Sequence, residues 1–183
     1  EPHVLLTLIL TAERAAEVDE LREAARSLRR RLPVLGGVAV SLCYSARSQS
    51  SSEFLPLSGV SESKDLLSAN FEDPSAPYQL VSHTSFLHVH SAQAAGLYEL
   101  LEKAVARATG DKPGRILDLY GGTGAIALCL ARAGHEATLV ESYPPAAALA
   151  SRAAQAQRLK VEVVTGDVAS VSRALAAAGS TFD

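Results

Sequence analysis

The stretch "ILDLYGGTGA" (residues 116–125) combines an apolar run, a carboxylate and three glycines, which is typical of a ligand-binding turn. Glycines let a ligand approach the backbone, and a helix that starts after them offers free N–H groups. A plain tight turn between a strand and a helix is the alternative. In an open parallel sheet, ligands bind beyond the carboxyl ends of the strands, which is where this turn would lie.

Two classes of ligand fit this turn. Residues 122–127, "GTGAIA", satisfy the G-x-G-x-x-G/A fingerprint of dinucleotide sites, and Glu141 follows about 20 residues later, where a ribose-binding carboxylate belongs. Asp118 favours a different ligand, because a carboxylate at the mouth of the strand would repel a pyrophosphate. S-adenosylmethionine has an ammonium, a sulfonium and a ribose but no phosphate. We therefore expect Asp118 near its methionine end and Glu141 at its ribose.

A third carboxylate, Asp167, follows the apolar segment "VEVVT". At the carboxyl end of a strand, it would accept a hydrogen bond from the amino group of adenine. It is also well placed to cap the helix that follows, and the two roles are compatible.

The elements that position these residues alternate regularly in the second half of the chain. Hydrophobic periodicity predicts strands at 115–119, 137–141 and 161–165, each followed by a helix, at 123–133, 144–158 and 168–178. This alternation predicts βαβ units and a parallel sheet with helices on both faces. Ser91 would cap a preceding helix, and the final "FD" would open a fourth strand. We place this domain at residues 91–183.

Residues 1–90 predict a smaller α+β region. Strands are expected at 3–10 and 38–45, with a helix at 12–31 between them. Acidic residues crowd the start of that helix and Arg29–Arg31 its end, as the helix dipole favours. These arginines could meet RNA phosphates, but a solvated helix end is the favoured interpretation in a chain of net charge −3. Short strands and turns follow, including "YQLVSHTSFLHVH" (78–90).

The second half resembles the RNA (uracil-5-)-methyltransferases, which make 5-methyluridine in tRNA and ribosomal RNA. "ILDLYGGTGAIALCLA", "VESYPPAAALASRAAQAQRL" and "VEVVTGDV" are similar to the cofactor-binding half of that family, and the Asp-Leu-Tyr opening is a comparatively specific cue. "SHTSFLHVHSAQAAGLYELLEKAV" resembles the family's Ser-Phe-x-Gln-x-Asn segment and the helix after it. The resemblance covers roughly residues 78–183. It implies a Rossmann-like class I methyltransferase fold, S-adenosylmethionine as cofactor, and tRNA or rRNA as substrate.

The residues expected at the cofactor come partly from the turn itself and partly from the resemblance: His88, Asp118, Tyr120, Gly122, Gly124, Ala125, Glu141 and Asp167. His88 stands where the family has Gln, His90 where it has Asn, and Ala125 where a polar residue is common. A histidine does not offer the paired donor and acceptor of an amide, and alanine has no polar group. These departures therefore bear on the affinity for the cofactor and on its orientation.

The catalytic groups of the family are expected outside this chain. In the family, a cysteine thiolate attacks the ring carbon next to uracil C5, and a base later removes a proton from C5. The resemblance places both groups after an Asp-Pro-Pro motif that would begin at or just after Asp183. Cys129 is expected to pack in the core, and Cys43 in a buried strand. Two cysteines also cannot hold the four-cysteine iron–sulfur cluster of some members.

Composition bounds the remaining possibilities. Hydrophobic residues make up 48% of the 183 and charged residues 20%, as in soluble globular proteins. No apolar run reaches the roughly 20 residues that a membrane-spanning helix needs, so no membrane partner is expected. The chain has no methionine, and we expect it to be a piece of a longer protein. Without a signal-peptide pattern or a disulfide framework, a cytoplasmic location is the default expectation.

Some alternatives stay open. His88 and His90 alternate along a predicted strand, but without a third ligand nearby no metal site is expected. The chain could belong to a methyltransferase acting on another substrate, to a nicotinamide-dependent oxidoreductase, or to a non-catalytic binding module. The oligomeric state is not indicated.

Overall fold

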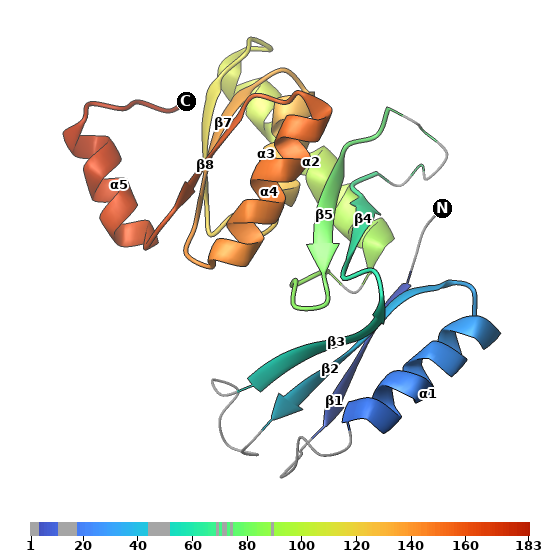
Figure 1. Cartoon of the computed structure of the whole chain (residues 1–183). Helices are drawn as coiled ribbons and strands as arrows, with labels where there is room; N and C mark the ends of the chain where they lie inside the picture. Colours follow the sequence, from blue (N-terminus) through green and yellow to red (C-terminus); the bar gives the residue numbers. More distant parts are fainter. Residues whose placement is uncertain are drawn as a thin grey trace. The chain divides into compact units, whose positions relative to one another are not determined.

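The structure is a computed structural model that describes residues 4–10, 18–43, 52–68, 70, 73, 75–88 and 90–183. The chain divides into two compact units, Glu1–Lys64 with Ser82–Thr84, and Asp65–Val81 with Ser85–Asp183. This division falls at other residues than the expected boundary near residue 90. Two domains at 1–90 and 91–183 stay a prediction, and each compact unit is described here by itself (Figure 1).

The first unit is a three-stranded sheet with one helix. Its elements are β1 (Val4–Leu10), α1 (Val18–Arg31), β2 (Leu35–Cys43) and β3 (Ser52–Gly59). The central strand β2 pairs with β1 in parallel and with β3 antiparallel. Apolar side chains of α1 pack on one face of this sheet and form the core of the unit. The expected start of the helix at residue 12 lies outside the described residues.

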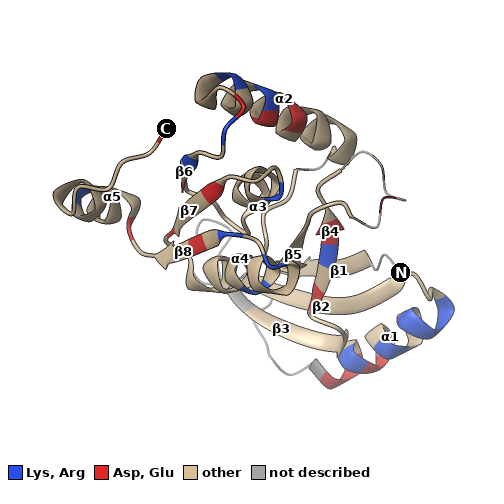
Figure 2. Ribbon diagram, turned by 90° about the horizontal axis from the view of Figure 1, so that it is seen from above, with Lys and Arg blue, Asp and Glu red and all other residues tan. Residues whose placement is uncertain are grey.

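The charges of α1 follow the helix dipole as expected. Acidic residues lie in its first turn and arginines in its last (Figure 2). Arg29 is half-buried, and its Nε donates to Leu35 O at 3.2 Å and its Nη1 to Ser58 Oγ at 3.3 Å. Arg26 and Arg30 both pair with Glu23 at the surface. Arg29 therefore joins the helix to the sheet, while contact of these arginines with RNA phosphates stays untested.

The second unit contains the expected alternation of strands and helices. After α2 (Ser91–Thr109) its elements are β6 (Arg115–Leu119), α3 (Ala125–Arg132), β7 (Glu136–Glu141), α4 (Pro144–Gln157), β8 (Val161–Thr165) and α5 (Val168–Ala177). The sheet order is β6-β7-β8, and both pairs are parallel, with Asp118 opposite Leu139. Helices α3 and α4 pack on one face of the sheet, and α5 lies on its other side (Figure 1). The predicted α/β fold with a parallel sheet is confirmed.

The segment before α2 differs from the sequence prediction. β4 (Glu62–Leu66) and β5 (Tyr78–Ser82) form a two-stranded sheet, and β5 ends well before residue 90. His88 therefore does not lie on a strand, and the expected alternation of His88 with His90 is wrong. His90, not Ser91, caps α2, because its Nδ1 accepts a hydrogen bond from Gln93 N at 3.2 Å. An imidazole nitrogen here replaces the hydroxyl oxygen that a serine cap would supply.

The last residues lie beside the first strand of the sheet without forming a strand themselves. Asp183 N donates to Arg115 O at 2.9 Å, and Arg115 N donates to Asp183 Oδ2 at 2.8 Å. The neighbouring Gly114 O accepts instead from Glu136 N of β7. Because successive residues of a strand point their polar groups to opposite edges, Asp183 lies on the edge of β6 away from β7. The chain thus crosses from β8 to the far side of β6, which makes the carboxyl end of β6 a topological switch point.

No helix in the part of the chain that the structure describes combines the length and the apolarity that crossing a membrane requires.

Candidate cofactor site

The turn after β6 has a backbone that only its glycines adopt easily. Gly122 has φ of 56° and Gly124 has φ of 93°, both in the left-handed region, and Gly124 is the N-cap of α3. Gly121 is needed for a different reason, because a β-carbon there would overlap the side chain of Leu139. A β-carbon at Gly122 would meet nothing within 4 Å. The turn therefore packs tightly on β7 at Gly121 and presents open backbone at Gly122.

Glu141 ends β7 directly beside this turn. Its Oε2 accepts a hydrogen bond from Gly122 N at 2.9 Å, and its Oε1 accepts one from Tyr143 N at 2.7 Å. Each carboxylate oxygen has two lone pairs, so the group keeps acceptor capacity for further donors. The sequence predicted that the glycine turn and an acidic residue about 20 positions later lie together. In the structure both lie at the same edge of the sheet.

Asp118 lies deeper than the sequence suggested. It is 8% exposed, inside β6, and its Oδ2 accepts a hydrogen bond from Ala127 N in the first turn of α3 at 3.2 Å. Burial raises the pKa of Asp118 to about 6; the bond from Ala127 opposes this rise, and the nearby charge of Glu141 adds to it. The carboxyl is therefore held behind the turn, and it ionises close to neutral pH.

Asp167 is exposed and caps α5, with its carboxylate accepting from Ser170 N at 2.8 Å. This hydrogen bond holds the pKa of Asp167 below its usual range. The capping role considered from the sequence is thereby confirmed. Gly166 N donates to Glu141 O at 2.9 Å, so the segment that carries Asp167 starts beside Glu141. Contact of Asp167 with adenine stays a prediction.

Of three other residues expected at the cofactor, Tyr120 and Ala125 lie next to the glycine turn, and His88 has no hydrogen bond to it among the described residues. Tyr120 is 74% exposed at the carboxyl end of β6, with φ of 60°. Ala125 is the first residue of α3, next to the turn. His88 is exposed and lies edge-to-face on Phe86, with ring centroids 5.6 Å apart. No hydrogen bond among the described residues joins His88 to the turn, so its role at the cofactor stays a prediction.

The sequence reasoning missed Tyr143, Thr123 and Gln79. Tyr143 is 48% exposed, and its backbone N–H donates to the carboxylate of Glu141. Its position two residues after Glu141 was the available signal. Thr123 Oγ1 donates to Gln79 Oε1 at 2.6 Å, which links the turn to β5. Thr123 occupies a variable position of the glycine fingerprint, and Gln79 lies far away in sequence, so no pattern could have paired them.

Cys129 packs in the core as expected. It is 2% exposed, and burial raises the pKa of its thiol to about 12. It is therefore unsuited to act as a nucleophile. The expectation that Cys43 is buried concerns a side chain outside the described residues.

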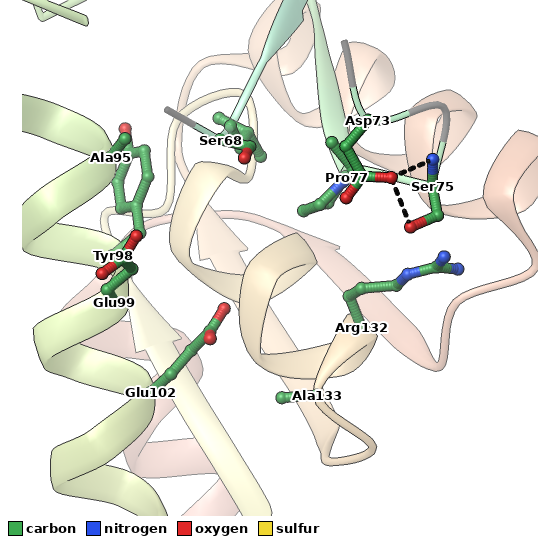
Figure 3. Close-up of a pocket in the computed structure, with 12 residues that line it drawn as sticks. Ser68, Asp73, Ser75, Pro77, Ala95, Tyr98, Glu99, Glu102, Arg132 and Ala133 are labelled. Carbon is green, nitrogen blue, oxygen red and sulfur yellow. Dashed lines mark hydrogen bonds between the residues drawn. The ribbon is translucent and has the colours of Figure 1, made fainter. Parts of the chain in front are cut away.

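A separate pocket opens at the other end of α3. It has a volume of about 260 Å³ and lies between α2, the end of α3 and the segment around Asp73, whose carboxylate accepts two hydrogen bonds from Ser75 (Figure 3). Glu102 of α2 and Arg132 of α3 contribute to its walls. None of the expected cofactor residues lines it. Since α3 is roughly 12 Å long at 1.5 Å per residue, this pocket is distinct from the turn.

Comparison with known proteins supports the reading of the second unit. Residues 93–176 match the sequence model of the methyltransferase small domain. This segment contains the glycine turn, Glu141 and Asp167. No protein of curated function matches the chain.

Solved structures share the fold over most of the chain. A tRNA (uracil-54, C5)-methyltransferase of Pyrococcus abyssi, in complex with S-adenosyl-L-homocysteine, is 18% identical, with a TM-score of 0.65 over 90% of this chain. The chain has a Rossmann-like class I methyltransferase fold. An Agrobacterium tumefaciens S-adenosylmethionine-dependent methyltransferase (21% identity, TM-score 0.55, 84% of this chain) and Pyrococcus abyssi Trm5b (11%, 0.56, 90%) are also similar.

The chain spans less than half the length of each of these proteins. The chain spans 36% of the length of the first of these proteins and 46% of each of the other two.

Proposed function

We propose that this chain is the cofactor-binding part of an S-adenosylmethionine-dependent methyltransferase. The observation that carries the proposal is the carboxylate of Glu141, held 2.9 Å from Gly122 N at the carboxyl end of the parallel sheet. The match of residues 93–176 to a methyltransferase domain supports the same cofactor. When bound, the cofactor supplies the methyl group, and the residues of this chain bind and orient it.

The residues of the site fit this cofactor. Glu141 accepts from Gly122 N through Oε2, and from Tyr143 N and Ser142 Oγ through Oε1, so Oε2 retains a lone pair for a ribose hydroxyl. The space beside Gly122 leaves room for a ligand against the backbone. Asp118 supplies negative charge behind the turn, which attracts the ammonium of the methionine end and repels a pyrophosphate. Tyr120, Ala125, Asp167 and His88 complete the proposed set.

The proposed substrate is RNA, with methyl transfer to carbon 5 of a uridine in tRNA or rRNA. Support comes from the motifs that resemble RNA (uracil-5-)-methyltransferases. The tRNA (uracil-54, C5)-methyltransferase of Pyrococcus abyssi also shares the fold over 90% of this chain, which includes residues before the methyltransferase segment. Cys129 is buried, so it is not proposed as the family's nucleophile, and no residue of this chain is proposed as the nucleophile or the base. A cytoplasmic location belongs to the same proposal.

The experiment that tests this function is a methyl-transfer assay. The full-length protein is incubated with radiolabelled S-adenosylmethionine and unmodified tRNA or rRNA, and the nucleosides are analysed after digestion. We expect label in 5-methyluridine. Label in another nucleoside would refute uridine specificity, and label in protein or small molecules alone would refute an RNA substrate.

A further inference from the structure

Thr123 is a buried residue of the glycine turn, and its hydroxyl is held by a buried amide. Thr123 is 6% exposed and Gln79 4% exposed. Thr123 Oγ1 donates to Gln79 Oε1 at 2.6 Å, a short bond for two neutral groups. Because both groups are buried, neither has water as a substitute partner, and losing the bond carries a desolvation penalty.

The orientation of the Gln79 amide is fixed by a carboxylate. Gln79 Nε2 donates to Asp65 Oδ2 of β4 at 2.7 Å. A carboxylate only accepts hydrogen bonds, so the amide must turn its nitrogen to Asp65 and its oxygen to Thr123. The hydroxyl of Thr123 is then obliged to act as the donor. The three side chains form one directed chain from β4 through β5 to the turn.

The backbone that carries Gln79 is itself anchored to the methyltransferase fold. Gln157 of α4 binds both polar groups of the neighbouring residue: its Oε1 accepts from Tyr78 N at 3.0 Å, and its Nε2 donates to Tyr78 O at 2.8 Å. Leu67, next to β4, and Leu80 of β5 pack in the same core as Leu128 of α3. The amide of Gln79 is therefore a fixed point against which the turn is positioned.

We propose that Gln79, oriented by Asp65, is a positioning residue for the glycine turn and so for the cofactor. The turn is held on two sides, by Glu141 at Gly122 N and by Gln79 at Thr123. The left-handed conformations of Gly122 and Gly124 lie on either side of Thr123, so a fixed Thr123 restrains both. The identity of the ligand in this inference rests on the proposed function, whereas the claim that Gln79 holds the glycine turn does not.

The test compares two replacements of Thr123. Thr123→Val keeps the shape and removes the hydroxyl, whereas Thr123→Ser keeps the hydroxyl. S-adenosylhomocysteine is titrated calorimetrically into each, and amide hydrogen exchange is measured at Gly122 and Gly124, with Leu139 as a reference in the core. We expect Thr123→Val to weaken binding about threefold to tenfold, the size of one lost hydrogen bond, and Thr123→Ser to stay near wild type.

Hydrogen exchange separates positioning from general destabilisation. We expect Thr123→Val to speed exchange at Gly122 and Gly124 more than at Leu139. Equal acceleration at all three amides, or unchanged binding by Thr123→Val, would overturn the proposal. Should Thr123→Val not fold, Gln79→Asn withdraws the amide by one methylene and is measured in the same way. A wild-type chain that does not bind S-adenosylhomocysteine refutes the proposed function, while the exchange data still decide whether Gln79 holds the turn.

Discussion

Replacing Asp118 with asparagine should stabilise the fold and weaken binding of the cofactor. Burial raises the pKa of Asp118 from its usual 3.8 to about 6, so ionising it inside the fold is unfavourable. At 1.36 kcal/mol per pKa unit, this difference corresponds to a cost of about 3 kcal/mol at pH 8. Asparagine removes the charge, and its carbonyl can still accept from Ala127 N. We expect Asp118→Asn to raise the free energy of unfolding at pH 8 by about 1–3 kcal/mol.

The sign of the pH dependence follows from the raised pKa. Between about pH 4 and pH 6 the folded protein binds more protons at Asp118 than the unfolded chain does. The wild-type stability attributable to this group is therefore greatest at low pH and falls as the pH rises through about 6. The advantage of Asp118→Asn should shrink as the pH falls below 6 and disappear only well below pH 4, where the carboxyl is neutral in both states.

Urea unfolding of the two proteins at pH 4.5 and pH 8 measures this effect. Calorimetry at pH 8 measures the affinity for S-adenosylhomocysteine. We expect Asp118→Asn to bind it about tenfold to a hundredfold more weakly, which is the scale of a hydrogen bond to a charged group. Asp167→Asn is the matched control for the urea measurement, because the pKa of exposed Asp167 is lowered and loss of its charge should not stabilise the fold. Lower stability of Asp118→Asn at pH 8, or unchanged binding, would refute the reasoning.

Four further predictions test other parts of the site and its surroundings. Glu141→Ala should weaken binding of S-adenosylhomocysteine by about 1–3 kcal/mol in calorimetry, because it removes the carboxylate expected at the ribose; equal affinity would place the ribose elsewhere. Gly121→Ala should lower the free energy of unfolding by about 1–3 kcal/mol, since its β-carbon overlaps Leu139, and a stable variant would contradict the packing. Cys129 should resist iodoacetamide at pH 8 in the native chain and react only after unfolding, as mass spectrometry would show. This chain alone should transfer no methyl group to uridine, so labelled 5-methyluridine from it would show that the catalytic groups are misplaced.

Much of the methyltransferase fold could be predicted from sequence because its signals are local. Glycine positions and apolar runs predicted the bounds of β6, β7 and β8 to within one residue, and those of the helices between them to within about two. Glu141 could be paired with the glycine turn because a parallel sheet brings successive strand ends to one edge. The depth of Asp118 could not be predicted, since it depends on how α3 packs over β6.

Three features of the structure could not be predicted from local sequence, because they depend on the folded chain. The segment from Tyr78 to His90 alternates in polarity like a strand, but of its described residues only Tyr78–Ser82 pair with another strand. Helix α2 begins at Ser91, so the cap position falls on His90, whose imidazole accepts the hydrogen bond expected of a serine. The bond between Thr123 and Gln79 joins residues 44 positions apart, and only the folded chain brings them together.

The central claim is that the glycine turn of this chain binds S-adenosylmethionine. The direct measurement is nuclear magnetic resonance of the isotopically labelled chain during titration with S-adenosylhomocysteine, and separately with NAD. We predict saturable shifts of the amide signals of Gly122, Gly124 and Tyr143 with S-adenosylhomocysteine, and none with NAD. Shifts at these amides with NAD and none with S-adenosylhomocysteine would contradict the account.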